Sequence, residues 1–161
     1  MVQENLETFI QMAEIDPNRK GLPEEVFPHV PIRQIVLSFP FPLRFWMAKN
    51  PGFQSNILTI TIRAVSGLLR KKAKTVGLKQ KLEFAIATVI QRFGGSINLN
   101  PHLHMLWVDG LYDVAEETPV FHRISPTDEE VRKLVETLSK RILKYLKKRG
   151  YPVDEESDKP L

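Results

Sequence analysis

The chain has 161 residues, of which 42% are hydrophobic, and this length and composition suit one globular domain with a sizeable core. It contains no cysteine, which excludes disulfides, thiolate zinc sites and a cysteine nucleophile. No apolar run is long enough to span a membrane, and the first residues lack the profile of a signal peptide. We therefore expect a soluble cytoplasmic protein.

The net charge of +4 is unevenly distributed along the chain. Residues 31–110 carry eleven basic and two acidic side chains, whereas residues 1–30 and 150–161 carry more acidic than basic ones. A basic centre favours a polyanionic partner, nucleic acid first, although a solvated surface would have the same composition. The basic side chains expected to contact phosphates are Arg63, Arg70, Lys71, Lys72, Lys74, Lys79, Lys81 and Arg92.

The first half of the chain is expected to contain one strand and three helices. Apolar spacing predicts an amphipathic helix over residues 4–14, followed by a proline-rich irregular arm over residues 16–31. Residues 32–38 predict a strand that ends at two prolines, which cannot donate to a ladder. Helices are expected over residues 43–49 and 53–74, the second with basic residues near its C-terminal end.

The second half begins with strands. Residues 83–93 are apolar and β-branched, which predicts a strand ending at Gly94-Gly95-Ser96. Residues 102–108 predict the next strand. Asp109-Gly110 is a turn signal, and a short strand over residues 110–115 is expected after it.

The last helix is marked at both ends. Thr127 and Glu130 have the spacing of a capping box, and Gly150 suits the position just past the helix. Strands and helices that do not alternate regularly predict an α+β domain, in which helices flank an antiparallel sheet. We expect this domain over residues 30–150, after an acidic helix and arm (1–29) and before an acidic tail (151–161).

His102 and His104 form a His-x-His pair on the strand that we expect to be central in the sheet. Alternate side chains of a strand share a face, so both imidazoles point the same way, with Cα atoms about 6.6 Å apart. Two imidazoles at this spacing can bind one metal ion. Packed histidines with satisfied hydrogen bonds are the alternative interpretation of the same pair.

A third ligand is expected from the preceding strand. A hairpin between the two strands would bring Gln91 beside His102 or His104. The alternative is that Gln91 is an ordinary polar residue facing the ladder of the sheet, with no ligand role. Asp109 has the wrong strand parity for this site, and His122 is expected in a loop or on the surface. Nitrogen and oxygen ligands suit Mn²⁺ or Mg²⁺.

Several ordered motifs resemble the rolling-circle insertion-sequence transposases, which are HUH endonucleases of the tyrosine type. HUH stands for His-hydrophobic-His, which is the pattern of residues 102–104. The resemblance extends over about residues 26–150. Its motifs lie at residues 30–44, 90–94, 98–100, 102–104, 109–110, 121–123, 126–130 and 146–150.

The resemblance implies an HUH-like antiparallel sheet and a reaction on single-stranded DNA at transposon ends. Two histidines and one polar ligand would hold a divalent metal that polarises the scissile phosphate. A tyrosine would attack this phosphate and form a 5′-phosphotyrosine, releasing a 3′-hydroxyl, and strand transfer would reverse the chemistry. A protein with this role in DNA transposition is expected to associate with the nucleoid.

The chain departs from the family pattern at two places. The family begins with a cysteine-rich zinc region, which this sequence lacks, and its nucleophilic tyrosines lie downstream of the matched region. Tyr112, Tyr145 and Tyr151 do not match the nucleophile position, so the catalytic residue stays unassigned. We expect a truncated or split transposase, whose C-terminal half a separate gene would supply.

Two other functions are compatible with the residues. One is a non-catalytic nucleic-acid-binding or interaction protein derived from such a domain. Its stacking groups would be Phe39, Phe41, Phe45, Trp46 and Trp107, although core packing suits most of these aromatics. The other is a histidine-based phosphohydrolase of small nucleotides, with Gly94-Gly95-Ser96 as its phosphate loop.

Overall fold

The structure is a computed structural model that describes residues 10–13, 30–78, 81–93 and 99–151. The elements in chain order are β1 (Ile10–Ala13), β2 (Ile32–Leu37), α1 (Phe41–Lys49), α2 (Pro51–Thr75), β3 (Leu82–Glu83), β4 (Ile86–Phe93), β5 (Leu99–Val108), β6 (Gly110–Asp113), β7 (Val120–Arg123) and α3 (Asp128–Arg149). The fold is α+β, as the sequence predicts.

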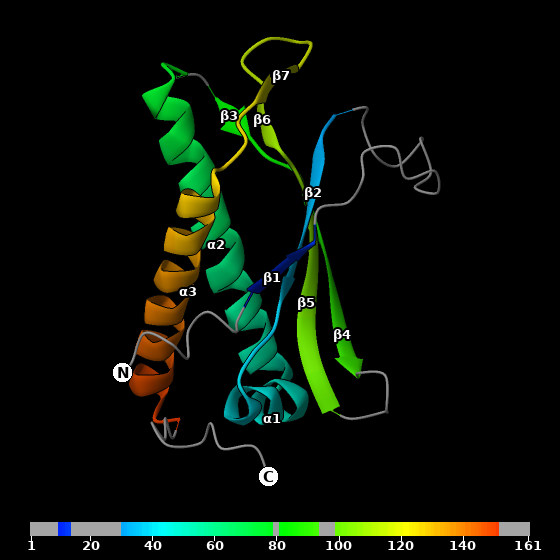
Figure 1. Ribbon diagram of the computed structural model, residues 1–161, viewed down its shortest axis with the longest axis vertical. Coiled ribbons are helices and arrows are strands. Elements are labelled where there is room, and N and C mark those ends of the chain that lie inside the picture. The colour runs from blue at the N-terminus through cyan, green and yellow to red at the C-terminus, as the bar shows by residue number, and fades with distance from the viewer. Residues whose placement is uncertain (1–9, 14–29, 79–80, 94–98, 152–161) are drawn as a thin grey trace.

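The described strands form two antiparallel sheets (Figure 1). The larger sheet has the order β1-β2-β5-β4, and the smaller one has the order β3-β6-β7. β5 therefore pairs with β2 on one side and β4 on the other. The chain passes directly from the larger sheet to the smaller one between β5 and β6.

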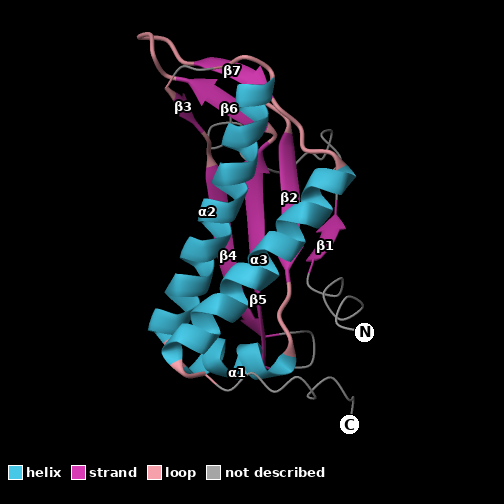
Figure 2. Cartoon of the chain, turned by 90° about the vertical axis from the view of Figure 1, so that its left-hand side faces the viewer, coloured by secondary structure: helices cyan, strands magenta, loops and turns pink. Residues whose placement is uncertain are grey.

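The helices cover one side of the four-stranded sheet, as both views show (Figures 1 and 2). Ile35 and Leu37 on β2, with Leu103, Met105 and Trp107 on β5, are all at most 2% exposed. These odd-numbered residues belong to the same buried cluster as the apolar faces of the helices. The even-numbered residues of β5 consequently lie on the side of the sheet that the described helices leave uncovered.

Local sequence signals explain the two long helices. Asn50 Oδ1 accepts a hydrogen bond from the Phe53 amide at 3.0 Å, and Pro51 occupies the first helical position of α2. At the start of α3, Thr127 and Glu130 form the reciprocal capping box that the sequence predicts. Gly150 ends this helix with φ of 70°, in the left-handed region that glycine favours.

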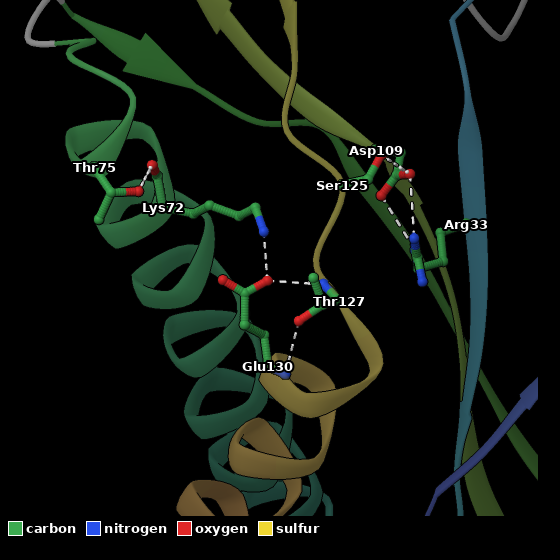
Figure 3. Close-up of polar contacts among 7 residues, drawn as sticks. All are labelled: Arg33, Lys72, Thr75, Asp109, Ser125, Thr127 and Glu130. Carbon is green, nitrogen blue, oxygen red and sulfur yellow. Dashed lines mark hydrogen bonds and ion pairs between the residues drawn. The ribbon is translucent and has the colours of Figure 1, made fainter.

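Two polar clusters connect distant elements (Figure 3). Arg33 donates from Nε to Asp109 Oδ1 at 3.1 Å and from Nη2 to Asp109 Oδ2 at 3.2 Å, and Ser125 Oγ donates to Oδ2 at 2.6 Å. Lys72 on α2 pairs with Glu130 on α3 at 2.5 Å. The first cluster joins β2 to the β5–β6 junction, and the second joins the two long helices.

Three predicted elements differ from the structure. The predicted helix over 4–14 is wrong over its described part, because residues 10–13 form a strand whose pairing with β2 outweighs local helical spacing. The predicted strand 83–93 is divided into β3 and β4, which pair in different sheets. Asp109-Gly110 is a bend between sheets rather than a hairpin turn, because β6 pairs with β3 and β7.

β7, at residues 120–123, is not expected from the sequence, since four residues give too short a pattern to recognise. The expected boundaries at 1–29 and 151–161 fall almost entirely outside the described residues. No helix in the described part of the chain combines the length and the apolar character that crossing a membrane requires.

Candidate functional site

The uncovered side of the four-stranded sheet carries the histidine pair. His102 and His104 lie on β5, with Gln34 and Val36 on β2 and Val89 and Gln91 on β4. In the antiparallel register, His104 lies between Val36 and Val89, and His102 lies opposite Gln91. We call these six residues, together with Asn100 and Leu106 of β5, the histidine face.

The two imidazoles are neighbours, with ring centroids 4.7 Å apart. His102 Nδ1 lies 2.6 Å from the backbone carbonyl oxygen of Asn100. A carbonyl oxygen only accepts, so Nδ1 carries the proton and donates it. In the neutral form of this ring, the other nitrogen, Nε2, has the lone pair that binds a metal ion.

His104 contains a buried polar atom without a partner. Its Nε2 has no hydrogen-bond partner among the described residues, although it is shielded from solvent. Burial, followed by the charge of nearby His102, lowers the pKa of His104 from its usual 6.5. The ring is therefore neutral at neutral pH, and one nitrogen has a free lone pair.

Gln34 decides which nitrogen of His104 has that lone pair. Its side-chain amide lies against His104 Nδ1, with Nε2 of Gln34 at 3.5 Å from it. An amide flip exchanges the oxygen and nitrogen of Gln34 without moving the side chain. As placed, the amide nitrogen donates to Nδ1 and leaves the proton of His104 on the buried Nε2; in the flipped amide the oxygen would face the ring, Nδ1 would donate and Nε2 would have the lone pair. Sequence reasoning did not select Gln34, although strand alternation over 32–38 would have placed it on this face.

Two amide side chains are placed to supply a third ligand. Gln91 is exposed and lies opposite His102, in the register that the hairpin predicts. Asn100 precedes His102 by two residues on β5, and its Oδ1 is buried without a hydrogen-bond partner in the described structure. No set of three or more histidine, cysteine, aspartate or glutamate side chains gathers for a metal in the described part of the chain. Among the described side chains, the amide oxygens of Gln91 and Asn100 are the candidates for a third ligand.

The other residues weighed for metal binding lie elsewhere. Asp109 is bound by Arg33 and Ser125 beyond the end of β5. His122 lies on β7 in the smaller sheet, opposite Leu111. The expectation that His122 lies in a loop or on the surface is wrong, because His122 is half-buried on a strand.

Most of the expected phosphate contacts lie away from the histidine face. Arg63, Arg70, Lys71 and Lys74 are exposed on α2, in the helical layer on the opposite side of the sheet, and Lys72 of α2 pairs with Glu130. Lys81 is exposed just before β3, and Lys79 lies outside the described residues. Arg92, exposed on β4 next to Gln91, is the one member of the set on the four-stranded sheet.

The three tyrosines lie in other parts of the molecule. Tyr112 packs against Phe121 in the smaller sheet, with ring centroids 5.1 Å apart. Tyr145 on α3 and Tyr151 after it both pack against Phe53 of α2. Burial, and then the neighbouring Tyr151, raise the pKa of Tyr145 from 10.0, which makes it a poorer nucleophile.

The aromatic residues considered for base stacking, and the glycine segment considered for phosphate binding, differ in their exposure. Phe39 and Trp107 are buried in the core, and Trp46 packs against it. Phe45 is 42% exposed, with Lys49 Nζ 4.5 Å from its ring centroid. The side chain of Phe41 and the segment Gly94-Gly95-Ser96 lie outside the described part.

Residues 85–160 match the model of a protein family described as "Putative transposase". The matched segment contains β4, β5 and α3, and therefore both histidines and Gln91. No curated protein and no solved structure matches the chain. The match supports a transposase family and, with it, a function related to transposition.

Proposed function

We propose that the histidine face is the DNA-processing site of a rolling-circle, HUH-type transposase domain, where single-stranded DNA and a divalent metal bind. The observation that carries the proposal is the buried, unpartnered Nε2 of His104 beside His102, whose Nδ1 is already bound to a carbonyl. Burying an unsatisfied nitrogen costs free energy unless a ligand binds it.

The residues present fit a divalent metal. His102 and His104 would hold it, with Gln91 or Asn100 as the amide ligand, and Mn²⁺ or Mg²⁺ suits this set of donors. When bound, the metal would polarise the scissile phosphate. The protein's own contribution is orientation: the Asn100 carbonyl fixes the ring of His102, and Gln34 contacts the ring of His104.

Single-stranded DNA suits the open sheet surface. Val89 is 65% exposed beside the histidines and offers an apolar contact for bases. The described helices all lie on the other side, so a strand can approach without their displacement. The nucleophilic tyrosine would come from a partner such as a separately encoded C-terminal half, because none of the three tyrosines lies on this face.

The first test is titration calorimetry with Mn²⁺ on the full chain, comparing His102→Ala and His104→Ala with His122→Ala. The first two variants should lose measurable binding, whereas His122→Ala keeps it because β7 lies in the other sheet. Circular dichroism checks that each variant is folded. Unchanged affinity in both site variants would refute the metal site.

The second test measures binding of single-stranded DNA by fluorescence anisotropy over a salt series. The affinity should fall with a log–log slope of about −0.7 for each neutralised phosphate. Salt-independent binding, or no binding at low salt, would contradict the proposal.

The positions of the tyrosines favour a second candidate, a non-catalytic nucleic-acid-binding protein derived from such a domain. In that case DNA binding would persist in His102→Ala and His104→Ala, and no metal would be needed. The two functions therefore differ in whether Mn²⁺ changes the affinity for a single strand.

A further inference from the structure

The C-terminal half of α3 carries a row of basic side chains that the histidine face does not use. Lys140, Arg141, Lys144, Lys147 and Lys148 are all exposed. We call these five residues the α3 basic stripe. Their spacing of one, three and four residues puts them on one side of the helix, over about 12 Å of its length.

The stripe faces away from the protein interior. The buried positions of the same part of the helix are Leu138, Ile142 and Leu146, which belong to the core cluster. On a helical projection at 100° per residue, these three residues point to the side opposite the stripe. Figure 2 looks onto the helical layer and shows α3 running across it, on the side of the sheet opposite the histidine face.

Residues 137–149 contain six basic residues and no acidic one, and the nearest acidic residue of α3, Glu136, lies one helical turn before Lys140. The ion pairs of α3 form near its other end, where Glu129 binds Arg132 and Lys133, and Glu130 binds Lys72. In the described part of the chain, neither these pairs nor the one between Arg33 and Asp109 includes a residue of the stripe.

The basic end of α2 has different surroundings. Arg70, Lys71 and Lys74 are close in sequence to Lys72, which the ion pair with Glu130 holds beside the acidic first turn of α3. The neighbour of the stripe is the N-terminal half of α2, as the Phe53–Tyr145 contact shows, and residues 51–62 have no charged side chain. The positive electrostatic potential should therefore be stronger over the α3 basic stripe than over the basic end of α2. This holds although α2, and not α3, belongs to the basic central part of the sequence.

We propose that the α3 basic stripe is a second DNA-binding surface, which holds the phosphate backbone of duplex DNA while the histidine face binds a single strand. The stripe has no aromatic side chain on which unpaired bases could stack, because the aromatic residue of this segment, Tyr145, packs against Phe53. A membrane-binding helix would need an exposed apolar face, but that face of α3 is buried. The inference goes beyond the proposed site chemistry and does not depend on the metal.

The test compares two triple variants of the full chain with the same loss of charge. One is Lys140→Gln, Lys144→Gln and Lys148→Gln; the other is Arg70→Gln, Lys71→Gln and Lys74→Gln. All six positions are exposed, so both variants should keep the helical circular dichroism of the original protein. Anisotropy with a 20-base-pair duplex and with a single strand of equal length gives the affinities over a salt series.

The α3 triple should weaken duplex binding about tenfold or more and make the salt slope shallower by about 0.9 for each phosphate that is no longer neutralised. The α2 triple should have a smaller effect, and the loss in the α3 triple should be the same with and without Mn²⁺. If the histidine face binds no metal, the expected loss of duplex affinity in the α3 triple variant would therefore be unchanged. Equal losses in the two triples, unchanged duplex affinity in the α3 triple, or a loss confined to the single strand would each overturn the proposal.

Discussion

At the scale of single residues, Gln34 is the polar side chain whose position sequence reasoning did not anticipate. We expect Gln34→Leu to weaken Mn²⁺ binding about 10- to 100-fold, because His104 loses the group that fixes its tautomer and ring orientation. Gln34→Glu should restore most of the affinity, since a carboxylate only accepts and therefore keeps the proton of His104 on Nδ1. Calorimetry on the two variants measures the difference, and equal affinity in both would argue against this role.

Gly110 gives a prediction about stability. A Cβ at this position would lie 2.6 Å from Phe121 Cζ and would also collide with the backbone carbonyl of His122. Gly110→Ala should lower the free energy of unfolding by about 1–3 kcal/mol, as other overpacked sites do. Gly67→Ala is the control, because its Cβ meets nothing within 4 Å on an exposed turn of α2, and alanine favours a helix. Urea unfolding of both variants would test the contrast.

At this scale the sequence predicts the histidine pair and Gln91, because strand alternation and one hairpin determine their positions. It does not reveal that Asn100 Oδ1 is buried without a partner, since burial depends on the whole sheet. It also misreads Asp109-Gly110, whose composition is that of a hairpin turn. The glycine is needed there because β7 passes close to it, a contact between distant parts of the chain.

At the scale of elements, the start of α3 combines a capping box with an ion pair. The hydrogen bond from Lys72, then that from the Thr127 amide, lowers the pKa of Glu130 from its usual 4.5. A lowered carboxyl pKa gives stability that is present above pH 4.5 and is lost as the pH falls through the folded-state value. Glu130→Gln should therefore cost about 1 kcal/mol near neutral pH and progressively less below pH 4.5.

Glu136→Gln is the matched control, because this exposed residue on the same helix takes part in none of the ion pairs described above. It should change the stability by less than about 0.5 kcal/mol at any pH. Thermal unfolding at a series of pH values would show the difference between the two variants. A constant difference between Glu130→Gln and the original protein down to pH 3 would be inconsistent with the pairing.

Element by element, local signals predict the helices better than the strands. Asn50 and Pro51, and Thr127 with Glu130, mark helix starts within a few residues, so α2 and α3 follow from the sequence. β1 and β7 have four residues each and exist through pairing, which no local pattern encodes. The assignment of β3 and β4 to different sheets is likewise a tertiary property.

At the scale of the molecule, the four-stranded sheet lies between Tyr145 of α3 and the histidine face. We expect that this chain, incubated with Mn²⁺ and single-stranded DNA of an element end, gives no covalent adduct on a denaturing gel. In-line attack needs a tyrosine oxygen close to the phosphorus, and the described tyrosines are bound in other packing contacts. An adduct that disappears in Tyr112→Phe, Tyr145→Phe or Tyr151→Phe would contradict this expectation and identify the nucleophile.

The pairing of β2 with β5 also has a consequence for the order of folding. β4 and β5 are adjacent in sequence, so their hairpin closes a short loop, whereas Arg33 meets Asp109 across 76 positions. The entropy of closing the longer loop must be overcome before β2 gains any contact with β5. We therefore expect the β4–β5 hairpin and α2 to form before β2 docks. Arg33→Met would then accelerate unfolding in stopped-flow measurements and leave the refolding rate almost unchanged.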